Sequence, residues 1–356
     1  MGQSGQQNPR TGSGSVTSKD VAARAGVSVA SVCRVFDKKW KGRVSAKLEQ
    51  KVLSAAQELG YHPNALARGL ISKRSGIIGV VMSEEFNSFY FDLFCRMTNL
   101  IQELGMRVMV FNAAAYRNLQ DIFNCFLAYQ VDGIIITAAS LAAGFESLKG
   151  DTPFPAPVIL VNVYRHSTAW PSVICDNRRG TREMARYLYD MGGREFLFLS
   201  AFKSQYYDVE ERLEGFRSGL EACGPHRLHI EYGDYTYESG QEIARRVLSR
   251  KERPDTVFST GTRMALGYMD AARYSFGLRI PADFNIAAYD DLIGAQFQSY
   301  DLTCIEQPSQ ELAEKAVQLL SDALNGAPKA SRIYREPPRL RLRGSVSRRR
   351  PVLLSP

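Results

Sequence analysis

The sequence predicts an α/β protein: a small helical head, a hinge helix and a body of two doubly wound lobes, each built on a parallel sheet. Three observations lead to this fold class. Positive charge gathers at the two ends of the chain, short helical patterns fill residues 16–61, and from residue 77 apolar runs alternate twice over with helical patterns. With 356 residues and 45% hydrophobic residues, the chain is long enough for two or three domains with buried cores.

The charge is divided between a basic head, an acidic body and a basic end. Residues 16–76 hold twelve Lys and Arg against four Asp and Glu, and residues 332–350 hold eight against one. The whole chain has a net charge of +8 and Arg10 adds one more positive charge, which leaves −8 for residues 77–331. A basic block on an acidic body is typical of a polyanion-binding module attached to a second unit. A merely solvated charged surface would give the same pattern.

The first helix of the head is predicted between Thr17 and Gly26. Thr17 and Asp20 have the spacing of a capping box, and Gly26 supplies the stop. One face of this helix is apolar and consists of Val21, Ala22 and Ala25.

Two further helices follow, after Ser28 and after Ser45, and the third ends at Gly60. The second helix has an apolar stripe at i, i+3, i+4 spacing, formed by Val32, Val35 and Phe36. Its other side carries Val29, Ala30, Cys33 and Arg34. The third helix is expected to bury Leu48, Val52, Ala55 or Ala56, and Leu59.

Two short helices joined by the tight turn Ala25-Gly26-Val27 form a helix-turn-helix, whose second helix lies in the DNA major groove. The small residues of this helix let its backbone approach the base edges. Arg34 can donate two hydrogen bonds to a guanine, and Val29 and Ala30 can pack on thymine methyl groups. Contacts that position the DNA backbone are expected from Thr17, Ser28, Ser31, Ser45 and Tyr61. A small helical bundle that binds protein is the alternative interpretation.

A hinge is predicted in "YHPNALARGLISKRSG", residues 61–76. Pro63 ends the preceding element, Asn64 can cap a short helix through Leu70, and "SKRSG" is typical of a linker. So short a helix, without an apolar face for a core, is marginal alone in water, and we expect it to need a partner to fold.

Two series of strands and helices are predicted in the body. The strands are "GIIGVVM", "RVMVFN", "GIIIT" and "PVILVN" in the first series, then "SVICD", "EFLFLS", "RLHIEYG", "TVFST" and "NIAAYD". Helices are expected near 89–104, 117–130 and 140–149, then 178–191, 209–223, 237–251 and 263–275. We expect the chain to cross between lobes three times and a helix at 310–326 to return to the first lobe. Ligands of such sheets bind beyond the carboxyl ends of the strands, which predicts a cleft between the lobes.

These patterns set the expected domain boundaries. The head occupies 16–61, the hinge and linker 62–75, and the body 76–346. Lobe 1 is expected at about 76–175 plus 305–331, and lobe 2 at about 176–304 plus 332–346. Residues 1–15 and 347–356 are predicted to be disordered tails.

The motifs together resemble the lactose-repressor (LacI/GalR) family of bacterial transcription regulators. The resemblance runs from about Val16 to Ser345 and rests on "VTSKDVAARAGVSVASVCRVF", "RVSAKLEQKVLSAAQELGYHPNALARGL" and the motifs of the body. It implies a periplasmic-binding-protein-like body. It also implies that hinge helices of two subunits fold together in the minor groove, where Leu70 would wedge between base pairs. The other matching hinge positions are Asn64, Ala67 and Arg68. Cys33 stands where the family usually has serine, so the operator sequence cannot be copied from a relative.

The resemblance also implies which residues border an effector in the cleft. They are Phe89 and Tyr90 in "NSFY", Asn162, Arg212 in "ERLEGFRSGL", Tyr235, Thr262, Asp290 in "AAYDD", and Gln307. A guanidinium fork suits vicinal hydroxyls or a carboxylate. One departure stands out, because "STGTRMALG" has Gly261 and Thr262 where relatives commonly have Asn-Asp. The effector is therefore a sugar or related metabolite, a more anionic or differently shaped molecule, or the site no longer binds one.

The sequence thus predicts a homodimeric cytoplasmic repressor on the bacterial nucleoid that binds a near-palindromic operator and a small-molecule effector, without cofactor or metal. There are only four histidines, and no G-x-S-x-G, Walker A or G-x-G-x-x-G motif is present, which argues against an enzyme. The six cysteines form no CxxC, and we expect reduced thiols, mostly in the core. No signal peptide or long apolar run indicates secretion or a membrane. A solute-binding protein and an architectural DNA binder without effector remain as alternatives.

Overall fold

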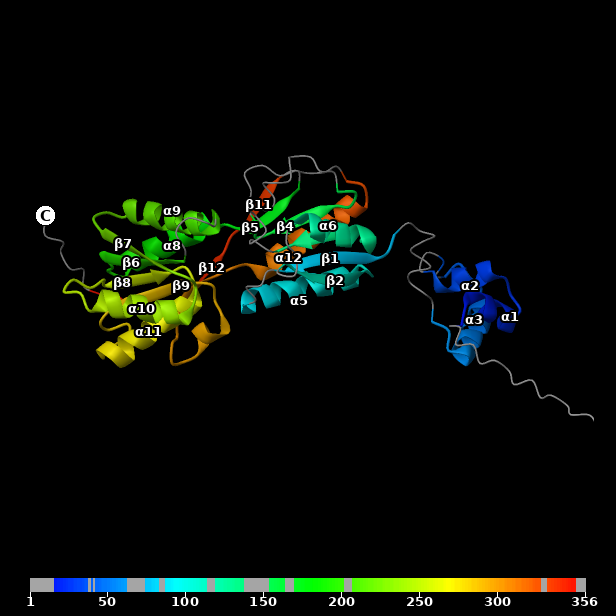
Figure 1. The fold of residues 1–356 in the computed structure, drawn as a ribbon, viewed down its shortest axis with the longest axis horizontal. Coiled ribbons are helices and arrows are strands. Elements are labelled where there is room, and N and C mark those ends of the chain that lie inside the picture. The colour runs from blue at the N-terminus through cyan, green and yellow to red at the C-terminus, as the bar shows by residue number, and fades with distance from the viewer. Residues whose placement is uncertain are drawn as a thin grey trace, which may run out of the picture. The chain divides into compact units, whose positions relative to one another are not determined.

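The computed structural model describes residues 16–37, 40, 42–62, 74–82, 87–113, 119–137, 154–163, 170–201, 207–327 and 332–349. The chain divides into two compact units, Met1–Ser75 and Gly76–Pro356 (Figure 1). The first unit contains the head and the second contains the body. The predicted hinge helix and the helix expected at 140–149 lie outside the described residues.

The described residues of the head form three helices packed around one small core. They are α1 (Ser18–Ala25), α2 (Val29–Phe36) and α3 (Ala46–Leu59). The capping box forms as the sequence predicts, since the Thr17 amide donates to Asp20 Oδ2 at 2.8 Å. Gly26 and Gly60 end α1 and α3 in the left-handed conformation. The buried side chains come from all three helices and are Val21, Ala22, Ala25, Val32, Val52, Ala55 and Ala56. Leu48 and Leu59, expected to be buried, are only partly buried and pack against this cluster.

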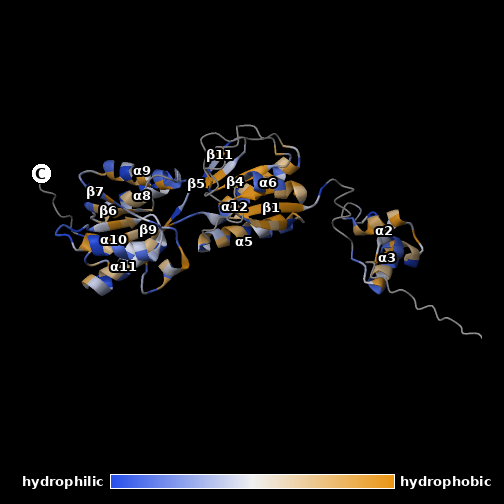
Figure 2. Cartoon of the chain, viewed as in Figure 1, coloured by the Kyte–Doolittle hydropathy of each residue, from blue (hydrophilic) through white to orange (hydrophobic). Residues whose placement is uncertain are grey.

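Lobe 1 is built on a six-stranded sheet with the order β11-β5-β4-β3-β1-β2. Its strands are β1 (Ile77–Met82), β2 (Arg107–Asn112), β3 (Gly133–Ile136), β4 (Val158–Val161), β5 (Ser172–Cys175) and β11 (Ile333–Glu336). All neighbouring pairs are parallel. Its described helices are α5 (Ser88–Glu103), α6 (Leu119–Ala128) and α12 (Ser309–Leu324). The central strands are apolar throughout because helices cover both faces of the sheet (Figure 2).

Lobe 2 repeats this arrangement with the order β12-β10-β9-β8-β6-β7. Its strands are β6 (Glu195–Ala201), β7 (Arg227–Gly233), β8 (Thr256–Ser259), β9 (Asn285–Tyr289), β10 (Thr303–Glu306) and β12 (Arg339–Arg341). Its helices are α8 (Asn177–Asp190), α9 (Tyr207–Glu221), α10 (Tyr237–Leu248) and α11 (Thr262–Phe276), with a 3-10 turn η4 (Ile293–Gln296). Among the described strands of this lobe, only β12 runs antiparallel to its neighbour.

The chain crosses between the lobes three times, and the third crossing corrects the expected boundaries. β5, whose apolar pattern stands in the second predicted series, pairs with β4 in lobe 1, where the expected boundary at about 175 places it, and β10 pairs with β9 in lobe 2. β11 was expected in lobe 2, yet it pairs with β5 in lobe 1, with Ile333 opposite Ser172. The crossings therefore follow β5, β10 and β11. Strand membership depends on pairing between distant segments, which local patterns do not encode.

The end of the body is also longer than expected. Ser347 donates its amide to Asn285 Oδ1 at 3.0 Å, and Arg349 donates its amide to the Met191 carbonyl at 2.7 Å. Arg349 Nη1 also lies 3.3 Å from the Pro281 carbonyl oxygen. Residues 347–349 are therefore held by lobe 2, and the predicted disordered tail begins too early in the sequence.

Candidate DNA-reading face and effector site

Helix α2 presents its small residues to solvent and keeps its apolar stripe inside. Val32 is fully buried, whereas Val29, Ala30, Cys33 and Arg34 are exposed. The helix is fixed at its start by Ser28, whose Oγ accepts the Ser31 amide at 3.1 Å. An exposed face of small side chains on a capped helix can approach base edges closely. Cys33 is also exposed, so it is not part of the core.

Arg34 lies over the ring of Trp40, with its Cζ 5.0 Å from the ring centroid. This cation–π contact restricts the Arg34 guanidinium to fewer orientations. The sequence pattern did not point to Trp40, which follows α2 in "DKKWKGR".

The other residues expected near DNA in the described head lie at helix ends. Thr17 precedes α1 and Ser45 precedes α3, where the Ser45 Oγ accepts the Leu48 amide at 3.4 Å. Tyr61 follows α3 and makes an edge-to-face contact with Phe36, with ring centroids 5.7 Å apart. Asn64, Ala67, Arg68 and Leu70 lie outside the described residues.

Three of the expected effector residues have strained backbones. Among the described residues, five that are not glycine have positive φ, and they include Asn162 at 52°, Tyr235 at 67° and Asp290 at 71°. This left-handed region costs most L-residues roughly 1–2 kcal/mol, and asparagine and aspartate adopt it more readily than tyrosine does. Such strain concentrates at functional sites because the surrounding structure must hold it in place.

Arg212 is almost completely buried, with 5% of its surface exposed, and the protein's own groups surround its guanidinium. Nε donates to Asn177 Oδ1 at 3.0 Å, and Nη1 donates to the Thr260 carbonyl at 3.1 Å and to the Tyr235 hydroxyl at 3.5 Å. Nη2 lies 3.3 Å from Asp208 Oδ2. Four of the five N–H groups of the guanidinium therefore have a partner in the protein.

The guanidinium also stacks on a buried tyrosine. Arg212 Cζ lies 3.7 Å from the ring centroid of Tyr289, whose hydroxyl lies 3.2 Å from Cys175 Sγ. Burial acts to lower the pKa of Arg212, but interactions with Tyr235, Asp208, Tyr289 and Asp290 raise that pKa above its ordinary value. Burial raises the pKa of the Cys175 thiol to about 12, so this group stays protonated at neutral pH.

A directional chain of hydrogen bonds joins the two lobes beside Arg212. The Cys175 amide donates to Asn162 Oδ1 at 3.0 Å, and Asn162 Nδ2 donates to Gln307 Oε1 at 2.8 Å. Gln307 Nε2 then donates to Asp290 Oδ1 at 2.6 Å. Asn162 belongs to lobe 1, Gln307 to the second crossing and Asp290 to lobe 2. We call Asn162, Arg212, Tyr235, Asp290 and Gln307 the inter-lobe cluster.

Asp290 is the anionic acceptor of this cluster. Burial raises its pKa above the ordinary value of an aspartic acid, although Arg212 and Gln307 act to lower it. One of its carboxylate oxygens accepts from Gln307, and the other has no hydrogen-bond donor among the described residues.

Gly261 and Thr262 support the cluster from the start of α11. A Cβ on Gly261 would lie 2.6 Å from Tyr235 Cδ1, so the glycine makes room for the tyrosine ring. Thr262 is buried, and its hydroxyl donates to the backbone carbonyls of Tyr289, at 3.2 Å, and of Asp290. Thr262 therefore holds the backbone at Asp290.

Phe89 and Tyr90 lie at the start of α5, capped by Asn87 Oδ1, which accepts the Tyr90 amide at 3.1 Å. Their rings meet edge to face at 5.1 Å and pack on the lobe 1 core. The same helix is tied to the segment after Gln307, because Ser309 Oγ donates to Asp92 Oδ2 at 2.5 Å.

Comparison with known proteins identifies the family to which this arrangement belongs. Residues 17–64 match the lacI family of bacterial regulatory proteins, and residues 185–346 match the periplasmic binding protein-like domain. Catabolite control protein A of Priestia megaterium is 30% identical over 335 residues, which cover 93% of this chain and 99% of that protein. The chain belongs to the LacI family.

Solved structures of another LacI-family protein share the fold. The Lac repressor bound to ONPG in the repressed state superposes with a TM-score of 0.80 at 27% identity, over 94% of this chain and 100% of that one. The Lac repressor dimer bound to operator and the anti-inducer ONPF gives a TM-score of 0.79 at the same identity and coverage. Both results confirm the predicted two-lobed fold, and the LacI family is one of transcriptional regulators.

Several residues around Arg212 were not predicted from sequence. Asn177, Thr260 and Tyr289 all contact Arg212. Their shared signal is position, because each lies at the carboxyl end of a strand or within two residues after it. Within the described part of the chain, no three His, Cys, Asp or Glu residues are placed to hold a metal ion. No described helix is long and apolar enough to cross a membrane.

Proposed function

We propose that this protein is a sequence-specific transcriptional repressor whose operator affinity is controlled by a small molecule bound at the inter-lobe cluster. The observation that carries the proposal is the exposed face of α2, in which Val29, Ala30 and Arg34 point outward from a capped helix whose Val32 is buried. A helix of this kind is built to enter a major groove. The Lac repressor, a relative of known structure, is described as a dimer bound to operator.

Each residue of this face has a proposed role. Arg34 reads a guanine through O6 and N7, and Val29 and Ala30 pack against thymine methyl groups. Ser28, Ser31, Thr17, Ser45 and Tyr61 contact phosphates and fix the register of the head. The hinge residues Asn64, Ala67, Arg68 and Leu70 enter the minor groove and widen it by a leucine wedge. Two heads in a homodimer then read half-sites about 34 Å apart on a near-palindromic operator.

The contacts of the inter-lobe cluster favour a neutral, hydroxyl-bearing effector over an anionic one. Arg212 already has Asp208 beside it and offers one remaining N–H, so an added carboxylate or phosphate would compete with Asp208. Asp290 and its neighbours instead offer acceptors, which match the hydroxyl donors of a sugar or a nucleoside. Phe89 and Tyr90 supply an aromatic border from lobe 1. The three left-handed residues of the cluster support a ligand site that is retained and not decayed.

As a DNA-binding regulator the protein acts in the bacterial cytoplasm, on the nucleoid. Its activity consists of binding and not of catalysis, because the family it belongs to regulates transcription.

The test is selection of duplexes from a random library by the full-length protein at physiological ionic strength. We expect a near-palindromic consensus, bound roughly 10³-fold or more tightly than random duplex. Equal binding of selected and random duplexes would refute sequence-specific regulation. A thermal-shift screen of the same protein against sugars, sugar acids, nucleosides and phosphorylated metabolites then tests the effector class, and a response confined to anions would contradict it.

A further inference from the structure

The third crossing between the lobes is short and stiff, and a paired arginine stands on each side of it. β11 ends in lobe 1 at Glu336, Pro337 and Pro338 follow, and β12 begins in lobe 2 at Arg339. Two prolines in succession restrict the backbone here to few conformations. The crossing also packs closely on α8, because a Cβ on Gly180 would lie 2.5 Å from Pro338 Cγ.

Both arginines pair with glutamates of the opposite lobe. Arg335, on β11 of lobe 1, pairs with Glu211 on α9 of lobe 2. Arg339, on β12 of lobe 2, pairs with Glu311 on α12 of lobe 1. The Arg339 pair is half exposed and is therefore worth little in water.

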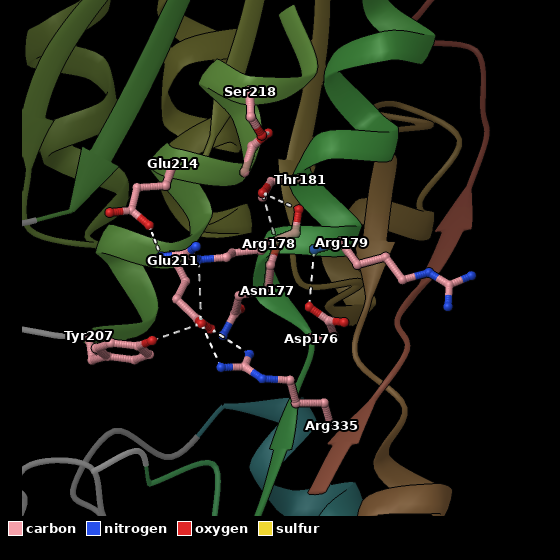
Figure 3. Close-up of polar contacts among 11 residues, drawn as sticks. Asp176, Asn177, Arg178, Arg179, Thr181, Tyr207, Glu211, Glu214, Ser218 and Arg335 are labelled. Carbon is pink, nitrogen blue, oxygen red and sulfur yellow. Dashed lines mark hydrogen bonds and ion pairs between the residues drawn. The ribbon is translucent and has the colours of Figure 1, made fainter. Parts of the chain in front are cut away.

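The pair of Glu211 with Arg335 is different because its carboxylate is buried (Figure 3). Glu211 is 1% exposed, and Arg335 meets it with two parallel bonds, from Nη2 to Oε1 at 2.9 Å and from Nη1 to Oε2 at 3.1 Å. The Tyr207 hydroxyl also donates to Oε1 at 3.0 Å, and Arg178 Nε lies 3.7 Å from the same oxygen. Two-pronged arginine–carboxylate bonds are both strong and directional. The hydrogen bond with Glu211 raises the pKa of Arg335 above its ordinary value, which agrees with a tight pair.

The pair of Glu211 with Arg335 is directly connected to Arg212, the proposed effector-binding arginine. Glu211 and Arg212 are consecutive residues of α9. Arg212 holds Asn177, and the next residue, Arg178, lies beside Glu211. Asp176 directly precedes Asn177, and its amide donates to the Glu336 carbonyl, at the start of the third crossing, at 2.9 Å. Any shift of α9 that a ligand produces at Arg212 therefore bears directly on the pair and on two crossings.

We propose that Glu211 and Arg335 form a latch that limits the relative motion of the two lobes and transmits effector occupancy at Arg212 to lobe 1. Separating α9 from β11 would remove both Arg335 bonds and leave the buried carboxylate with only the Tyr207 hydroxyl and the more distant Arg178, which is costly, so lobe orientations that break the pair are rarely populated. An effector changes the populations only through a difference in its affinity for the latched and unlatched states. The signalling part of this inference rests on the proposed function, whereas the limit on lobe motion does not.

The latch is tested by measuring the distance between the lobes in the full-length protein. Spin labels on non-natural amino acids at Ala128 of lobe 1 and Ala222 of lobe 2, both exposed, leave the six cysteines unchanged. Dilution with unlabelled protein suppresses the signal from label pairs in different subunits. Pulsed electron–electron double resonance then gives the distribution of distances between the two labels of one subunit.

The matched control is Glu214→Gln. Glu214 lies on the same helix as Glu211 and pairs with the same Arg178, but it is exposed and its contact stays within lobe 2 (Figure 3). We expect Glu211→Gln and Arg335→Gln each to broaden the distribution, the double variant to broaden it no further, and Glu214→Gln to match the wild type. If Glu211→Gln does not fold by circular dichroism, Arg335→Gln decides, because Arg335 lies at the rim of the pair with its side chain 33% exposed.

Wild-type distributions in Glu211→Gln and Arg335→Gln, or equal broadening in Glu214→Gln, would overturn the latch. This readout requires neither DNA nor effector, so it fails independently of the proposed function. Signalling is tested with a compound from the thermal-shift screen. Glu211→Gln should still bind that compound while the ratio of operator affinities with and without it falls toward one, and a wild-type ratio in this variant would refute the transmission.

Discussion

Replacing Arg34 by alanine tests whether α2 reads bases. Arg34 is exposed and contributes nothing to the buried core of the head, and the cap at Ser28 and the buried Val32 remain in the variant. The head should therefore fold normally. A bidentate contact to guanine discriminates against the wrong base by about 1–3 kcal/mol. Because each 1.4 kcal/mol is a factor of ten, the selected operator should lose roughly 5- to 150-fold in affinity.

Because Arg34 stacks on Trp40, we expect the loss of operator affinity in Arg34→Ala to lie in the upper part of the 5- to 150-fold range. An exposed cation–π contact is worth about 0.5–1 kcal/mol and holds the fork in few orientations before DNA arrives. Less conformational entropy is then lost on binding. Trp40→Ala should accordingly weaken operator binding in the same direction but by less, since the fork survives.

Fluorescence anisotropy measures both effects on the selected operator, on its single-base variants and on a random duplex, at one fixed salt concentration. The control is Arg24→Ala, which removes one positive charge from the same head at an exposed position paired with Glu58. Arg34→Ala should abolish the preference at one base pair of each half-site, whereas Arg24→Ala should leave every preference intact. An equal loss on all duplexes in Arg34→Ala would show that the side chain contacts phosphate only, and the base-reading role would be wrong.

Three further changes are expected to separate the head from the effector site. Val32→Ala deletes fully buried carbons, so the free energy of unfolding of the head should fall by about 2 kcal/mol. Circular dichroism follows the unfolding of the head, and the melting transition of the body, which should not change, is the control. Asp290 has a raised pKa in the folded protein, so its contribution to stability is present at acid pH and is lost as pH rises through that pKa. Asp290→Asn should therefore lose the effector response and unfold at a higher urea concentration than the wild type at neutral pH, with no difference in acid. An unchanged urea midpoint at both pH values would contradict this expectation. Gly261→Ala should displace the Tyr235 ring and weaken the thermal shift with effector while operator affinity is retained, and an unchanged shift would show that the ring can move aside.

The helices of the head follow from local rules, which is why the sequence alone predicts them. The capping residues Thr17, Ser28 and Ser45 and the stop at Gly26 and Gly60 act within one turn of the chain. The course of the chain between lobes is not local. β5 and β11 are both four-residue strands, and β5 lies in lobe 1 because it pairs with β4, while β11 lies there because it pairs with β5.

The candidate site was predictable in its parts but not in its connections. The resemblance to LacI-family motifs pointed to Arg212 and Asp290, and the structure shows how they are held. It did not reveal that Thr262 faces the backbone of Asp290, or that Glu211 beside Arg212 reaches the other lobe. Glu211 looks in sequence like a solvated helix glutamate. It is buried and accepts hydrogen bonds from Arg335, which is more than a hundred residues away and belongs to the other lobe.

Four of the five N–H groups of the Arg212 guanidinium already have a partner in the protein, and this limits how an effector can bind there. A ligand that takes more than its one remaining N–H must displace a contact that already exists. Displacing Asp208 is a local event, because Asp208 lies four residues away on α9. Displacing Asn177 instead releases the first crossing, next to Arg178 and the latch. Two ligands of similar affinity can therefore have opposite effects on lobe motion, since a ligand shifts the equilibrium only by its difference in affinity for the two states.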